Sequence, residues 1–158
     1  MVSVFLKNIC ENKILIISAM SWLVAGIFKV IVEFIINKKI ELNRIVGAGG
    51  MPSSHTSTVV ALAISTAYYA GINSPSFAIA IIFMIIVIHD ATGVRLETGK
   101  QAKVLNAMMF ESDAFKDLDF EKQLKEYVGH TPFQAIVGAL VGAFVSLASI
   151  YLFNIFNL

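Results

Sequence analysis

Apolar stretches alternate with short polar connections along most of this chain, and two long segments carry no charge. Residues 45–89 and 132–158 contain no Asp, Glu, Lys or Arg. Apolar runs of this length are typical of membrane-spanning helices. We therefore predict an all-α integral membrane protein, a single domain over residues 1–158 with a helical bundle of about four transmembrane helices. The predicted spans are residues 14–36, 56–70, 75–89 and 132–156.

Residues 94–128 break this pattern, because thirteen of these 35 residues are charged. Apolar positions still recur there at helical spacing, which predicts two amphipathic helices. We expect them at one face of the membrane, packed on its surface or over the mouth of the bundle. Residues 2–12 have a similar mixed pattern, which indicates a short helix on the membrane surface, with a frayed terminus as the alternative.

Two of the predicted spans begin with recognisable capping residues. Ser53 or Ser54 is a suitable N-cap for the second span. Thr131 as N-cap, Pro132 as the first helical residue and Gln134 three positions after the cap together predict a capping box for the last span.

The composition agrees with a protein of the membrane. Hydrophobic residues make up 57% of the chain and charged residues 15%. The formal net charge of +1 gives no support to a nucleic-acid partner. We expect membrane lipids as partners and a multi-pass location in the cell membrane. Small residues recur every four positions in two spans, which favours close helix packing and makes a homodimer a further expectation.

Helices that alternate in direction bring the polar ends of all four spans to one face of the membrane. The three histidines, His55, His89 and His130, all fall at that face. The opposite face carries the N-terminus, the turn near residues 71–75 and the C-terminus. Basic residues outside the spans divide nine to two in favour of the histidine face, which the positive-inside rule assigns to the cytoplasm. An anion site would gather the same cations.

Lys29 and Glu33 interrupt the first span. They are four residues apart and so lie on one helix face, where they can pair. Charged groups inside a span usually face a protein interior or a water-filled cavity. The alternative is that the bilayer ends near Val30 and that both residues lie among the lipid headgroups.

The side chains expected at the histidine face are suited to phosphate chemistry. Helix N-termini and the cations Lys29, Arg44 and Arg95 attract phosphate oxygens. One histidine can attack phosphorus while another protonates the leaving oxygen. Glycine-rich phosphate loops, cysteine-pair metal sites and the zinc motif His-Glu-x-x-His are absent from the sequence. We expect no metal and no cofactor.

Three motifs carry a resemblance to a known family. Residues 49–55 read Gly-Gly-Met-Pro-Ser-Ser-His, residues 90–95 read Asp-Ala-Thr-Gly-Val-Arg, and residues 129–132 read Gly-His-Thr-Pro. Together they resemble the divergent bacterial and plant branch of the type-2 phosphatidic acid phosphatase superfamily, which is related to acid phosphatases and vanadium haloperoxidases. The motifs are spread over nearly the full length of the chain.

The resemblance implies a mechanism and a set of site residues. His130 would be the nucleophile that forms a phosphohistidine, and His55 the general acid for the leaving alcohol. The implied phosphate-binding residues are Lys29, Ser53, Ser54 and Arg95, with Arg44 as a helper.

The chain also departs from the superfamily pattern. Leu124 stands where the superfamily has an arginine, so Arg95 can serve only if the amphipathic insert folds back. Gln134 replaces the aspartate that orients the nucleophile and stabilises its imidazolium form. Gln134 itself, Glu126 and Asp90, which we also count among the catalytic candidates, are the residues that can take over this role.

These observations lead to three functional hypotheses. The first is a metal-independent membrane phosphatase that hydrolyses a lipid phosphate or diphosphate through a phosphohistidine. The second is a catalytically silent relative that binds anionic lipid headgroups or a membrane partner protein, because Gln134 cannot carry the charge of the missing aspartate. The third is a small transporter subunit that uses Lys29 and Glu33. Apart from these hypotheses, the structural alternative for His55 is a histidine at a helix start, and for His130 a loop histidine bonded to a cap.

Overall fold

A computed structural model gives the structure of the protein, and it describes residues 2–38, 43, 45, 47, 49–111, 123–126 and 128–156. Within these residues the regular structure is helical and contains no strand, which confirms the predicted all-α class. The helices are α1 (Val2–Glu11), α2 (Lys13–Asn37), α3 (Ser54–Ala70), α4 (Pro75–Thr92), α5 (Val94–Glu111) and α6 (Pro132–Ile155).

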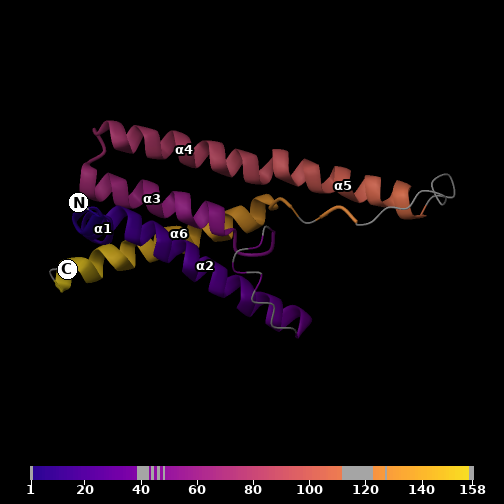
Figure 1. Ribbon diagram of the computed structural model, residues 1–158, viewed down its shortest axis with the longest axis horizontal. Helices are drawn as coiled ribbons and strands as arrows, with labels where there is room; N and C mark the ends of the chain where they lie inside the picture. Colours follow the sequence, from indigo (N-terminus) through magenta and orange to yellow (C-terminus); the bar gives the residue numbers. More distant parts are fainter. Residues whose placement is uncertain are drawn as a thin grey trace.

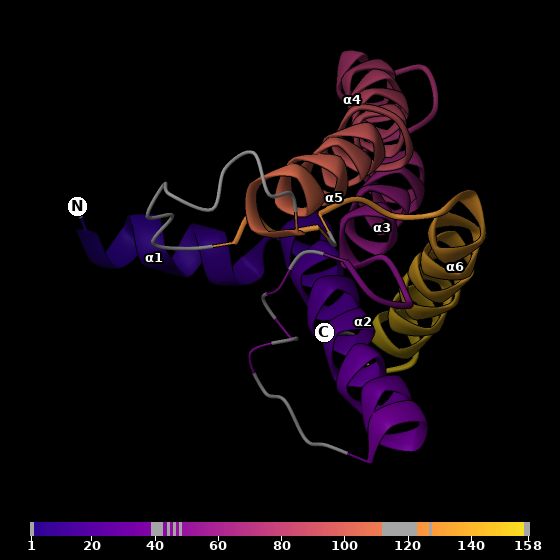
Figure 2. The ribbon, with the colours of Figure 1, turned by 90° about the vertical axis from the view of Figure 1, so that its right-hand side faces the viewer.

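Helix α3 lies at the centre of the bundle and contacts α2, α4 and α6 (Figures 1 and 2). Three helical segments are long and apolar enough to cross a membrane: α2, the run of α4 and α5, and α6. Helix α3 has 17 residues and is shorter. Its packing between the longer helices supports the fourth predicted span, which stays a prediction.

The helix starts are set by the predicted capping residues. The Ser53 hydroxyl accepts a hydrogen bond from the backbone N–H of Thr56, which makes Ser53 the N-cap of α3. Thr131 and Gln134 form both halves of the capping box at the start of α6. Each cap satisfies backbone N–H groups that have no partner within the helix.

Small residues let α6 and α2 approach α3 closely. A Cβ atom added at Gly142 would lie 2.3 Å from the Ser57 carbonyl oxygen, and one at Gly138 would lie 2.5 Å from that of Ser53. On the other side of α3, the Ser21 and Ser57 hydroxyls are 2.7 Å apart. The small-residue stripes are therefore used inside the chain, and the expected homodimer would need a different surface.

The insert differs from the predicted pair of amphipathic helices. The helix of the third predicted span does not stop at residue 89, because hydrogen bonds from Gly93 N to His89 O and from Glu97 N to Gly93 O carry α4 across into α5. Where the membrane-spanning part of this helix ends stays a prediction. Helix α5 therefore extends beyond the bundle as a continuation of α4 (Figure 1). The prediction of a second helix is wrong for residues 123–126 and 128. This return segment is not helical, and its hydrogen bonds go to Asn106 of α5.

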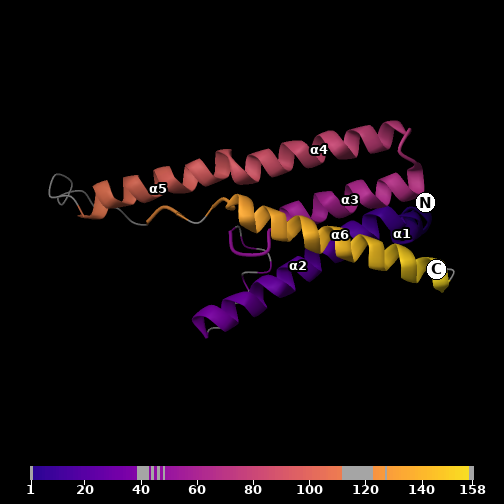
Figure 3. The same ribbon diagram turned by 180° about the vertical axis from the view of Figure 1, so that it is seen from behind.

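The ends of the helices are arranged as the alternation of directions predicted. The N-terminus, the turn between α3 and α4 and the C-terminus lie at one end of the bundle (Figure 3). The starts of α3 and α6 and the junction of α4 with α5 lie toward the other end. This second end carries the candidate site.

Candidate functional site

His130 is held by its backbone against the junction of α4 and α5. Its N–H donates to the Ala91 carbonyl over 2.9 Å. A Cβ atom at the preceding Gly129 would lie 2.3 Å from the Leu96 backbone nitrogen, so only glycine allows this close approach. The side chain of His130 is 1% exposed. The insert therefore does fold back, and it brings the Arg95–Leu96 backbone against the loop of the predicted nucleophile.

The structure brings His55 and His130 together from segments that are 75 residues apart in sequence. Their ring centroids are 6.2 Å apart and the ring planes are inclined by 58°. The loop before α3 is joined to α6 through a hydrogen bond from Ser53 N to Gln134 O, 3.2 Å long. The two motifs therefore form one site, as the resemblance implies.

Lys29 is buried in the protein close to this histidine pair. Its side chain is 2% exposed, and Nζ donates to Gly47 O over 3.0 Å and to the Ser54 hydroxyl over 3.3 Å. Lys29 therefore faces the protein interior, as expected for a charged group inside a span, and its depth in the membrane stays a prediction. Gly50, with φ of +80°, lies over the aliphatic stem of Lys29, where an added Cβ would be 3.2 Å from Lys29 Cγ.

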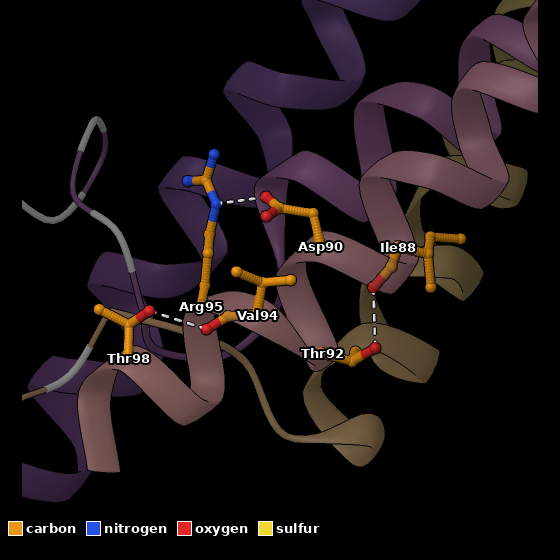
Figure 4. A network of polar contacts seen from close by, with 6 residues as sticks. All are labelled: Ile88, Asp90, Thr92, Val94, Arg95 and Thr98. Carbon is orange, nitrogen blue, oxygen red and sulfur yellow. Dashed lines mark hydrogen bonds and ion pairs between the residues drawn. The ribbon is translucent and has the colours of Figure 1, made fainter. Parts of the chain in front are cut away.

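Asp90 and Arg95 form an ion pair across the α4–α5 junction (Figure 4). Nε of Arg95 donates to a carboxylate oxygen of Asp90 over 2.5 Å, and the two terminal nitrogens of the guanidinium point away from that carboxylate. Thr92 and Thr98 bond back to the backbone of Ile88 and Val94 within the same helical run. The pair is partly exposed, so its guanidinium is accessible to an anion.

The environment of His130 favours its neutral form. Burial is the main cause that lowers the pKa of His130 to about 4, and the positive charge of the nearby Lys29 and the neighbouring His55 contribute to this shift. The Gln134 side chain and the Gly50 backbone lie beside the ring and partly offset this shift. Nδ1 is buried and has no hydrogen-bond partner among the described residues.

None of the three predicted orienting residues bonds to Nδ1 of His130 in the structure. Asp90 is paired with Arg95, and the Glu126 carboxylate accepts from the Asn106 amide over 2.9 Å. Gln134 uses its side-chain oxygen for the cap at Thr131 N. None of the three therefore holds Nδ1 of His130 as the missing aspartate would, and which residue replaces that aspartate stays a prediction.

The other predicted site residues differ in where they lie and in how exposed they are. Arg44 lies outside the described residues. Ser53 is buried and its hydroxyl caps α3, whereas His89 is exposed on α4.

Sequence reasoning missed Asn106, a buried amide in a charged helix that holds the return segment by three hydrogen bonds. Its only sequence signal is that it follows an apolar stripe at helical spacing.

A cavity of about 330 Å³ lies beside the histidine pair. Its walls include Gly49 and Gly50 before α3, Gly129 and Thr131 around His130, and one face of α5. Within the described residues, no group of three or more His, Cys, Asp or Glu is placed to hold a metal ion.

Comparison with known proteins shows the family of the chain. The model of the Divergent PAP2 family matches residues 10–145, which include all three motifs. The chain is 37% identical over 139 residues to the uncharacterised membrane protein YuiD of Bacillus subtilis (strain 168), covering 82% of this chain and 88% of that protein. No solved structure matches the chain. The protein is therefore a helical membrane protein that belongs to the Divergent PAP2 family.

Proposed function

We propose that the protein is a phosphatase of the cell membrane that hydrolyses a lipid phosphate or diphosphate without a metal. The observation that carries the proposal is the 6.2 Å separation of the His55 and His130 rings beside the buried ammonium of Lys29. A reacting atom lies about 3–3.5 Å from its nucleophile, so two rings at this spacing are close enough to act on one phosphoryl group.

The chemistry follows from the two imidazoles. Neutral His130 attacks phosphorus, and the bond from phosphorus to the lipid oxygen breaks while His55 gives its proton to that oxygen. Water then attacks the phosphohistidine, His55 takes up a proton from this water, and inorganic phosphate leaves. Lys29, Ser54 and Arg95 stabilise the negative charge on the phosphoryl oxygens, as fixed donors do in preorganised sites.

Phosphate release from a panel of lipid phosphates by the purified protein in detergent tests this proposal. His130→Ala removes the nucleophile and should abolish release, and His55→Ala should slow it by about 10²–10⁴-fold. His89→Ala is the matched control, because this third histidine is exposed at the same end of the bundle. It should leave the rate unchanged, and so should a chelator. Full activity of His130→Ala would contradict the mechanism.

The unpartnered Nδ1 of His130 favours one alternative, a silent relative that only binds anionic headgroups. An imidazolium without a carboxylate neighbour is less well stabilised. Binding of lipid phosphate by the wild-type protein, with no turnover on the whole panel, would support this alternative.

A further inference from the structure

The cavity beside the histidine pair has one wall that the phosphatase mechanism does not use. Leu96, Gly99, Lys100 and Lys103 line it from α5. These positions are spaced by three and four residues, so they share one face of the helix. Both lysines therefore lie on the wall that faces the histidine loop.

The opposite wall is held at a fixed distance by the return segment. A Cβ atom at Gly99 would lie 2.2 Å from the Glu126 carbonyl oxygen, so the segment lies directly against α5. Asn106 bonds to the backbone of Leu124 on both its N–H and C=O and to the Glu126 carboxylate. The cavity is thus built by tertiary contacts, and its volume lies within the range of small-ligand sites.

The charge of the cavity is positive. Lys100 and Lys103 contribute two ammonium groups, and Glu126 contributes one carboxylate that is already bonded to Asn106. Lys100 also pairs with Glu97 over 2.7 Å, but both side chains are more than half exposed. An exposed pair of this kind is weak and can exchange for another anion.

We propose that this cavity is a second anion subsite, in which Lys100 and Lys103 bind a phosphate group next to the one held between the histidines. The placement of the reacting phosphate rests on the proposed function. The preferred substrates are then lipids whose headgroup carries two phosphate groups, because a headgroup with a single phosphate leaves the lysines without a ligand.

Steady-state kinetics on two lipids in mixed micelles test the subsite. One lipid carries a single phosphate and the other carries a diphosphate on the same tail. The variant Lys100→Gln/Lys103→Gln should raise KM for the diphosphate lipid about tenfold or more, the size expected for lost charge-assisted hydrogen bonds. Its kcat/KM on the monophosphate lipid should change less than about twofold. Lys125→Gln removes a neighbouring exposed charge outside the cavity and is the matched control.

Equal losses on both lipids, or the same losses in Lys125→Gln, would show a general electrostatic effect and overturn the proposal. An unchanged KM for the diphosphate lipid in the double variant would overturn it as well. Thermal unfolding of the variants confirms that the fold is retained.

A binding measurement separates this proposal from the proposed function. Calorimetry on the His130→Ala protein with inorganic pyrophosphate, orthophosphate and the diphosphate lipid needs no turnover. The subsite predicts that pyrophosphate binds tighter than orthophosphate, and that the double lysine variant loses this preference. If only the diphosphate lipid binds tighter than orthophosphate, and pyrophosphate does not, the cavity is a subsite for a lipid headgroup and not for free pyrophosphate. If wild-type protein hydrolyses neither lipid but the preference exists, the phosphatase proposal fails and the subsite stands. Equal weak binding of all ligands overturns the subsite.

Discussion

At the scale of single residues, the candidate site is a set of polar groups withdrawn from water. Lys29, Ser53, Ser54 and His130 are each no more than 2% exposed. A buried ammonium is costly unless it is hydrogen-bonded, and Lys29 has such bonds to Gly47 and Ser54. A buried imidazole avoids the cost by staying neutral. Under the proposed mechanism, the same burial that costs stability keeps His130 in the neutral form that can attack phosphorus.

The pH dependence of activity belongs to this scale. His130 must be neutral to attack, and its pKa is lowered from 6.5 to about 4. The acid limb of kcat/KM should therefore fall near pH 4, with activity retained as the pH is lowered through 6. Because the folded-state pKa lies below the unfolded value, the folded protein also loses stability as the pH falls from about 6.5 toward 4.

A profile of kcat/KM against pH in detergent measures this limb. Lys29→Met removes a cation that lowers the pKa of His130 and should move the limb to higher pH. An acid limb at about 6.5 in the wild-type protein would mean that the ring is solvated.

At the scale of elements, close contacts between backbones decide how the helices meet. Gly138 places α6 against Ser53, the N-cap of α3, and Gly142 places it against the first turns of α3, which carry His55. At the other border of the site, Gly99 and Asn106 bind the return segment to α5. These contacts set the positions of the loops on which both histidines depend.

Gly142→Ala tests the packing of α6 on α3. Alanine is the better helix former by about 1 kcal/mol, so the change would stabilise a helix with open space. Here the methyl group would meet the Ser57 carbonyl oxygen at 2.3 Å. We expect a loss of about 1–3 kcal/mol from overpacking, seen as a lower Tm in detergent.

Leu140→Ala is the control for this change, because Leu140 is on the same helix and is 65% exposed. Its effect should stay within about 0.5 kcal/mol. A Tm of Gly142→Ala equal to or above that of the wild type would contradict the packing described above.

At the scale of the whole molecule, the number of membrane crossings determines where the site lies. Helices α2, α4 and α6 are long enough to cross, and α3 packs along them in the opposite direction to α2. A helix that packs in the bundle beside these spans must share their depth. We therefore expect α3 to cross as well.

Labelling with a membrane-impermeant maleimide tests this topology. Cys10 is exposed just before α2, and Ser74→Cys in a Cys10→Ser background probes the turn between α3 and α4. Both should react from the same side of the membrane, and Lys125→Cys in that background should react from the other. Reaction of positions 10 and 74 from opposite sides would mean that α3 does not cross.

The sequence by itself determined the helical membrane class, the caps at Ser53 and Thr131, and the gathering of the histidine motifs at one end. These features depend on local hydrophobicity, capping chemistry and the alternation of helix directions, all of which act over short stretches of chain. It was also sufficient to identify His55 and His130 as a pair, through the resemblance of their motifs.

Only the tertiary structure decided how the insert is used. The pattern of residues 94–128 suits two amphipathic helices, yet the return segment is not helical, because its backbone bonds to Asn106 and lies against Gly99. The burial of Lys29 and His130, and the lowered pKa that follows for His130, likewise depend on contacts between segments far apart in the chain. Such contacts leave no periodic signal in the sequence, because each depends on the shape of a partner that forms elsewhere.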